Sequence, residues 1–351
     1  MSLPYLQPYL GLSNGLNTLH GGAGAGGIGG WVELGRTTLG SAGDNITVSS
    51  LSNKRYYMIL QDIRASVNTT QGNWRFNSDT GTNYAGRRNY NGGTDYTTTS
   101  STYIESGGYD AGVPAFQISY VANYTSKEKL LQGHAGWSDA TGAATAPNRQ
   151  EITGKWANTS NAINEIISHN AGAGDYASGS ELVVLGWDPA DSHTNNFWEE
   201  LASVNGDGTG GFGTGSFTAK KYLWIQMWLD PSTNQFPKLQ FNSDGANNYS
   251  SRKSVNGAAD ATTTSFSGFD LVNSTSTPSF INIFIINNSS NEKLGIAHSV
   301  DQNTAGAANA PNRDERVGKW ANTSNQITSI DVVPDTGNYS TSSILKVWGA
   351  N

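Results

Sequence analysis

A tandem duplication is the feature that most constrains how this chain can fold. The segment Phe76–Asp79 recurs as Phe241–Asp244, and the octet Gly154–Asn161 recurs unchanged as Gly318–Asn325. Shorter matches join them at the same spacing: Asn83-Tyr84 with Asn248-Tyr249, Thr97–Thr99 with Thr262–Thr264, Glu128–Leu130 with Glu292–Leu294, and Ala146–Arg149 with Ala310–Arg313. Because a repeated sequence specifies a repeated structure, two similar domains are expected in tandem.

The duplication also predicts the domain boundaries. An extended, Gly-rich N-terminal arm is expected over 1–30, the first copy over 31–188, a linker over 189–196 and the second copy over 197–351. A polar linker this short allows little independent motion, so the two copies are expected to pack against each other.

Within each copy the apolar pattern has the period of β-strands. Apolar and polar residues alternate over 116–120 (Phe-Gln-Ile-Ser-Tyr), which predicts a half-buried strand. Residues 161–167 come nearest to a helical period, but the counterpart 326–333 ends in β-branched residues and favours a strand. Seven or eight strands per copy are expected. The predicted fold is all-β: two tandem antiparallel β-sandwich domains of jelly-roll-like type.

Composition excludes several classes of protein. Aromatic residues make up 10% of the chain, which argues against disorder. The formal net charge is -7 and no basic stripe is present, so nucleic acid is not an expected partner. Nor is a membrane, since no apolar stretch is long enough to span one. Cysteine is absent, which excludes disulfides and thiolate metal sites.

No pattern of catalytic residues is evident, and we expect neither an enzyme nor a cofactor. No histidines form an HExxH motif or a close pair. His134 and His298 occupy the same position in the two copies, which favours a role in the fold. Glu199 and Glu200 are adjacent, so on a strand they would point to opposite faces and could not form the facing pair of a glycosidase.

Two duplicated motifs have a structural and a functional interpretation. Asp79 and Asp244 each lie close to an Asn and could bind Ca²⁺ from a loop, although an Asx turn after a strand is favoured. Trp156 and Trp320 could stack on a sugar ring, although a core position is favoured because the surrounding octet is also retained.

The N-terminal arm has an unusual composition. Its first part is rich in Tyr, Leu and Pro, and residues 21–30 are almost all Gly and Ala. A passive disordered tail is one interpretation. The other is an arm that orders against another subunit, because a tail without a partner rarely carries so many apolar side chains. On the second interpretation the partner-binding residues are Tyr5, Leu6, Tyr9, Leu10 and Leu12.

The strand ending in Phe76–Asp79, followed by Asn83-Tyr84, Gly154–Trp156 and the closing strand to Gly186, resembles a module of structural proteins in tailed phages and other prokaryotic viruses. The resemblance implies a non-enzymatic virion protein: a capsid decoration or cement protein, a head fibre or a minor capsid protein. It also implies location in the virion, other virion proteins as partners, and a homo-oligomer, with a trimer favoured by analogy. The alternatives are a double-jelly-roll major capsid protein and a tail or fibre adhesin that binds host glycans.

Overall fold

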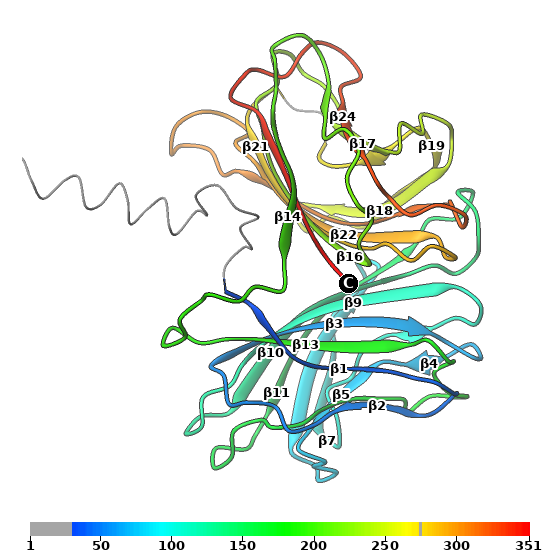
Figure 1. Ribbon diagram of the computed structural model, residues 1–351, viewed down its shortest axis with the longest axis vertical. Coiled ribbons are helices and arrows are strands. Elements are labelled where there is room, and N and C mark those ends of the chain that lie inside the picture. Colours follow the sequence, from blue (N-terminus) through cyan, green and yellow to red (C-terminus); the bar gives the residue numbers. More distant parts are fainter. Residues whose placement is uncertain (1–29, 274–275) are drawn as a thin grey trace, which may run out of the picture.

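A computed structural model of the chain describes residues 30–273 and 276–351, and these contain twenty-five β-strands and no helix (Figure 1). The strands form two antiparallel sandwiches, one from each copy of the repeat. In each sandwich a large, curved sheet of eight strands faces a smaller sheet. The predicted all-β class with two tandem sandwiches is therefore confirmed.

The first sandwich is built from thirteen strands. Its large sheet contains, in spatial order, β1 (Val32–Thr38), β13 (Glu181–Trp187), β3 (Tyr56–Arg64), β9 (Pro114–Ala122), β10 (Lys129–Trp137), β11 (Asn148–Trp156), β6 (Tyr84–Tyr90) and β7 (Tyr96–Ser101). The small sheet contains β2 (Asn45–Val48), β12 (Ile166–His169) and β5 (Asn73–Phe76), and β4 (Thr70–Gln71) pairs with β8 (Gly108–Tyr109).

The second sandwich repeats this order. Its large sheet contains β14 (Glu199–Asn205), β25 (Ile344–Ala350), β16 (Tyr222–Leu229), β21 (Ser279–Ile286), β22 (Lys293–Asp301), β23 (Asn312–Trp320), β18 (Tyr249–Val255) and β19 (Ala261–Phe266). Its small sheet contains β15 (Phe212–Gly213), β24 (Ile330–Val333), β17 (Lys238–Phe241) and β20 (Phe269–Asp270). The expected seven or eight strands per copy therefore match the large sheets alone and miss the small ones.

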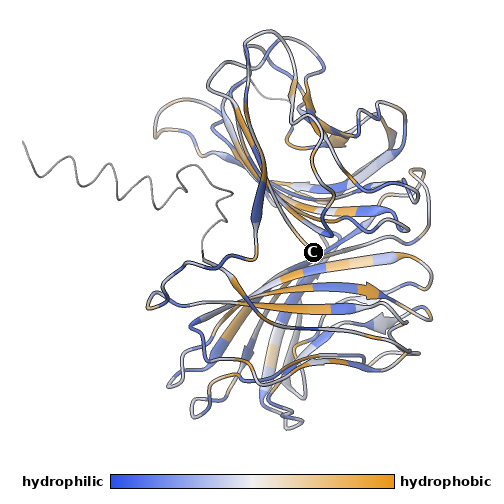
Figure 2. Ribbon diagram, in the orientation of Figure 1, coloured by the Kyte–Doolittle hydropathy of each residue, from blue (hydrophilic) through white to orange (hydrophobic). Residues whose placement is uncertain are grey.

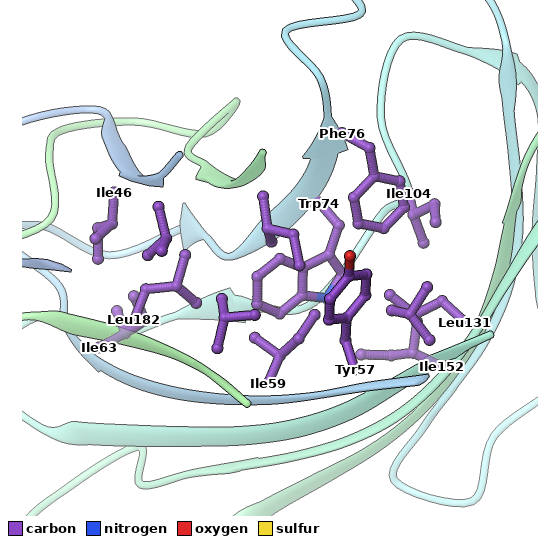
Figure 3. Close-up of a cluster of buried hydrophobic side chains, with 14 of the residues drawn as sticks. Ile46, Tyr57, Ile59, Ile63, Trp74, Phe76, Ile104, Leu131, Ile152 and Leu182 are labelled. Atoms are coloured by element: carbon purple, nitrogen blue, oxygen red, sulfur yellow. The ribbon is translucent and has the colours of Figure 1, made fainter. Parts of the chain in front are cut away.

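The core of each sandwich lies between its large and small sheets. In the first copy, Tyr57 and Ile59 point inward from β3 and meet Trp74 and Phe76 from β5 (Figure 3). The stretch 161–167, closest to a helical period in the sequence, is irregular up to Ile166, where β12 begins. Its counterpart ends in β24, so strands form at both places, as favoured.

The apolar residues over 116–120 of β9 point away from the core of the first sandwich. The simplest interpretation of the alternation would place them in that core. Gln117 and Ser119 point into the core of the first sandwich, where Gln117 accepts hydrogen bonds from Ser106 and Tyr109 at 2.7 and 2.9 Å. Phe116 and the next apolar residue of the strand point outward but are also buried. The prediction of a half-buried strand is therefore wrong, because a second layer covers the outer face.

That second layer is the other sandwich. The large sheets of the two copies meet through their outer faces, and the small sheets lie at the far ends of the molecule (Figure 1). Apolar residues recur along the strands of both large sheets (Figure 2). The shared cluster contains Met58, Leu60, Phe116, Ile118, Val183 and Leu185 from the first copy, and Trp198, Tyr222, Phe284, Ile286, Leu294, Ile296, Val317, Trp348 and Ala350 from the second. The expected packing of the copies is thus observed.

Candidate functional site

The duplicated tryptophan and aspartate form one structural corner. Trp156 is buried, and its Nε1–H donates to Oδ2 of Asp79 at 2.7 Å. The same carboxylate accepts hydrogen bonds from Asn83 Nδ2 at 2.9 Å and from the Gly81 amide at 2.8 Å. Because these donors occupy its oxygens, the favoured Asx turn is confirmed, and Trp156 is a core residue and not an exposed platform for sugars.

The second copy builds the same corner. Trp320 Nε1–H donates to Asp244 Oδ2 at 2.7 Å, and Asn248 donates to the same oxygen at 2.9 Å. Burial alone would raise the pKa of both aspartates, but the hydrogen bonds outweigh it, so the pKa of Asp79 and that of Asp244 lie below the usual value. Both carboxylates are therefore ionised acceptors that hold the corner together.

The adjacent carboxylates of β14 are each paired with a lysine. Glu199 lies 2.8 Å from Lys220, and Glu200 lies 3.6 Å from Lys346. Within residues 30–273 and 276–351, no three His, Asp or Glu side chains come together as a metal site. The same residues include no helix that is long and apolar enough to cross a membrane.

The two equivalent histidines meet where the sandwiches touch. The rings of His134 and His298 have centroids 4.1 Å apart. Burial, and then the neighbouring ring and Arg149, push the pKa of His134 well below its usual value. Burial likewise lowers the pKa of His298, although Glu315 opposes the shift. Both rings are therefore neutral near pH 7, and the two histidines, which form no close pair in the sequence, form one in the structure.

Two equivalent glutamates lie beside the histidine pair. Arg149 forms ion pairs with Glu151 and, at 3.1 Å, with Glu315, and it lies 2.7 Å from Asp260. Burial, together with the hydrogen bond to Glu315, raises the pKa of Glu151 to about 7. Burial opposes the shift, but the hydrogen bond from Glu151 together with the charges of Arg313 and Arg149 lowers the pKa of Glu315. The two glutamates therefore have pKa values shifted in opposite directions at the contact between the sandwiches.

This cluster predicts a pH dependence of stability. His134 and His298 have lower pKa values when folded, so the stability they allow is fully present above about pH 6.5 and is lost as the pH falls from that value toward their folded-state pKa values. Glu151 acts in the opposite sense: its pKa is raised, so between about pH 4.5 and 7 it favours the folded state as the pH falls. Glu151→Gln should therefore steepen the loss of stability below about pH 6.5.

The expected change in slope is up to one proton, or about 1.4 kcal/mol per pH unit. Urea unfolding at about pH 7, 6 and 5 measures it. Substitution of the exposed Gln302 by Asn, which changes no titratable group, serves as the control and should leave the slope unchanged. An unchanged or shallower slope in Glu151→Gln would show that the pKa of Glu151 is not raised in the folded protein.

An apolar groove opens on the outer face of the first large sheet. Its volume is 720 Å³, and its floor is formed by β3, β9, β10, β11 and β6, with β7 at one side. The residues that define it are Trp31, Tyr56, Tyr120, Leu130, Arg87 and Lys155. The rings of Trp31 and Tyr120 lie 6.5 Å apart at one end. Arg87 and Lys155, each paired with an acidic residue, form a charged rim at the other.

The arm predicted to bind a partner lies outside the described residues. Tyr5, Leu6, Tyr9, Leu10 and Leu12 belong to it. The first described residues lie beside the groove, because Trp31 lines it. The Gly30 amide donates to Asn196 Oδ1 at 2.7 Å, and the Phe197 amide donates to the Trp31 carbonyl at 2.7 Å.

The groove itself was missed by the sequence analysis. The available signal was that Leu130 and Tyr120, both apolar, lie on the same side of neighbouring strands as Lys155. The sequence alone could not show which parts of that face the second copy would cover.

No family model matches the chain, and no curated protein is similar to it in sequence. Among solved structures, domains LG4-5 of the mouse laminin alpha1 chain align with 93% of this chain and 91% of that chain, at 8% identity and a TM-score of 0.18. A likeness with so low a TM-score has no bearing on function.

Proposed function

We propose that this chain is a non-enzymatic structural protein of a virus particle, such as a capsid decoration or cement protein, a head fibre or a minor capsid protein. The proposal rests on the resemblance to phage structural modules, whose residues form one physical unit in each copy. In that unit the strand ends at Phe76, Tyr84 donates to the Phe76 carbonyl at 3.2 Å, and Asp79 holds Trp156. The residues that carry the resemblance are therefore in contact with one another and form one structural element.

The architecture supports such a role. Two sandwiches joined through a buried apolar face form a unit suited to repeated use on a particle surface, and charged residues are few at 14%. The conspicuous carboxylates are occupied: Asp79 and Asp244 hold tryptophans, and Glu199 and Glu200 pair with lysines. This arrangement supports a protein that binds without catalysing a reaction.

We further propose that other virion proteins are its partners, that it assembles as a homo-oligomer, and that it is located in the virion. Stoichiometry in purified particles separates the alternatives. Hundreds of copies on a lattice would support a capsid role, with a single dominant shell protein indicating the double-jelly-roll major capsid alternative. A few copies at a tail, with binding on a glycan array, would indicate an adhesin and overturn the capsid proposal.

Deletion of residues 1–20 tests the arm. The apolar side chains of the arm could each contribute roughly 1.5–3 kcal/mol when fully covered by a partner. We expect the truncated protein to melt almost as the full chain does, because both sandwiches lie outside the deletion, but to be lost from particles. Thermal unfolding and quantification of the chain in purified particles measure the two effects. Assembly at full occupancy would show that the arm is a passive tail.

A further inference from the structure

We infer that the groove of the first sandwich is the docking site for the loop 302–311 of a second copy of this chain. This docking would explain how the chain forms the homo-oligomer proposed above. The experiments that test it do not depend on the virion role. The inference follows from one contact between the two copies, in which a loop of the first copy lies on a receiving surface of the second. Both parts of this contact are duplicated in the chain. The second loop and the second receiving surface are exposed.

The contact made within the chain holds the loop 138–147 of the first copy against the second. Lys319 Nζ donates to the Ala140 carbonyl at 2.7 Å, and Arg252 Nε donates to the Pro147 carbonyl at 2.9 Å. These bonds reach the backbone of the loop, so they depend on its path more than on its side chains.

Three further bonds of this contact use the loop backbone, one of them from Ser250 Oγ to the Thr145 carbonyl at 3.0 Å, and one bond, from Ser138 Oγ to Glu292 at 3.4 Å, uses a side chain. The Ser265 amide on β19, at the edge of the large sheet, donates to the Ala143 carbonyl at 2.8 Å. Glu292 accepts from the Gly142 amide. The loop thus lies along a sheet edge as an added piece of extended chain, a mode of binding in which small residues allow close approach.

The residues that receive this loop are repeated in the first copy. Lys155, Arg87, Glu128 and Ser100 occupy the positions of Lys319, Arg252, Glu292 and Ser265. Their exposure differs sharply: the side chains of Lys319 and Glu292 are 0% and 2% exposed, whereas those of Lys155 and Glu128 are 45% and 39% exposed. The first copy therefore keeps these four receiving residues without a loop upon them, whereas a fifth, Ser250, is replaced by Ala85.

The loop is repeated as well. Residues 302–311 are exposed throughout and keep Gly306-Ala307-Ala308 and Ala310-Pro311, where the first loop has Gly142-Ala143-Ala144 and Ala146-Pro147. Gly142 and Gly306 share a left-handed φ, 86° and 91°, whereas the backbone differs at Asn303, whose φ is 57°, and at its counterpart Asp139, whose φ is not positive. The bonds of the first loop to Lys319, Arg252, Ser265 and Glu292 are made by its backbone from Ala140 onward, after that difference. The second loop can therefore offer the same acceptors.

The apolar residues beside each loop and each receiving surface also differ in exposure between the two copies. On the receiving side, Leu294 is 0% exposed and its counterpart Leu130 is 57% exposed. On the side that carries the loop, Phe116 is 1% exposed and its counterpart Phe280 is 43% exposed. Exposed apolar groups at these equivalent positions indicate a surface that a partner covers. Every molecule of this chain carries both the exposed groove and the exposed loop 302–311, so a second molecule can be that partner.

Crosslinking tests the contact directly, because the chain has no native cysteine. Ala143 and Ser265 are joined by a backbone hydrogen bond, so cysteines there lie within the roughly 7 Å that a disulfide can span between Cα atoms. Their exposed counterparts are Ala307 and Ser100. We expect a mixture of Ala307→Cys and Ser100→Cys proteins to form a disulfide-linked dimer on mild oxidation, and each variant alone to form much less.

Two further proteins complete this experiment. Ala143→Cys with Ser265→Cys in one chain should form an internal disulfide and shows that the geometry permits crosslinking. Ala307→Cys with Ser100→Cys in one chain, diluted before oxidation, reports whether the loop docks within its own molecule. An internally bridged monomer from this last protein, or no excess of dimer in the mixture, would overturn the proposal.

A substitution on the groove gives an independent test. Leu130→Glu places a charge on an exposed position, so melting should be unchanged while the sedimenting mass falls to that of a monomer. Val67→Glu, at an exposed apolar residue outside the groove, is the matched control and should keep the mass of the wild type. An unchanged mass in Leu130→Glu would also overturn the proposal. Both tests use purified chain without particles, so their outcome is independent of the virion role.

Discussion

Substitution of Arg316 by Ile should lower the free energy of unfolding by about 3–5 kcal/mol. Arg316 is fully buried inside the second sandwich, where its NH1 group lies 2.5 Å from Asp270 and its NH2 group lies 3.3 Å from Asp314. Removing the guanidinium leaves Asp314 buried without its cation. The cost of that unpaired charge, and not the loss of attraction alone, sets the size of the effect.

The first copy provides a matched control for this substitution. In the first copy, Ile152 occupies the position of Arg316, and Gln150 occupies the position of Asp314. The double variant Arg316→Ile with Asp314→Gln therefore reproduces an arrangement that already folds in this chain. It should recover most of the lost stability in urea unfolding, and a double variant as unstable as the single one would contradict the explanation.

Substitution of Trp198 by Ala should cost a similar amount, about 3–5 kcal/mol. Trp198 is fully buried between the two sandwiches, with ring centroids 5.7 Å from Trp224 and 6.1 Å from Phe284. Its removal leaves a large cavity in the cluster that joins the copies. Urea unfolding followed by tryptophan fluorescence measures the loss, which should fall on the second copy and on the contact between copies.

Trp31, which directly precedes β1 as Trp198 precedes β14, serves as the control. It is partly exposed, and its ring lies against that of Tyr120 at the groove. Trp31→Ala should therefore cost about 1–2 kcal/mol, measured at a concentration low enough to keep the chain monomeric. Equal losses from the two substitutions would mean that the contact between copies adds nothing to the burial of Trp198.

Much of the fold could be predicted from the sequence because local pattern and repeat agree. The matching octets around Trp156 and Trp320 required two similar domains, and both tryptophans were expected in the core. The Asx turns at Asp79 and Asp244 were also predictable, since an aspartate after a strand readily accepts local backbone donors.

The direction in which strands face could not be predicted. Phe116 and Gln117 alternate as a half-buried strand would, yet Gln117 points into the sandwich and Phe116 points at the other copy. Alternation of apolar and polar residues shows that the two faces of a strand differ, but it does not show which face is buried. Here both faces of the strand are buried. A buried glutamine is tolerated because Ser106 and Tyr109 satisfy its oxygen.

The groove was unpredictable for the same reason. Leu130 and Leu294 follow the same Glu-Lys pair in the repeated sequence, and nothing local distinguishes the exposed leucine from the buried one. The difference arises from how the two sandwiches are placed, which is a property of the whole chain. Short motifs cannot carry that information.

The meeting of His134 with His298 also has a historical meaning. When two identical proteins associate about a two-fold axis, a residue on the axis contacts its own equivalent in the partner. A histidine and, beside it, a glutamate do so here within one chain. Such pairs are expected if an ancestor with a single sandwich paired with itself before its gene doubled, but the two-fold relation is kept only here, because loop 138–147 lies on the second copy whereas its counterpart 302–311 is exposed. Fusion then freed the two halves to diverge, and Arg316 in place of Ile152 is one result.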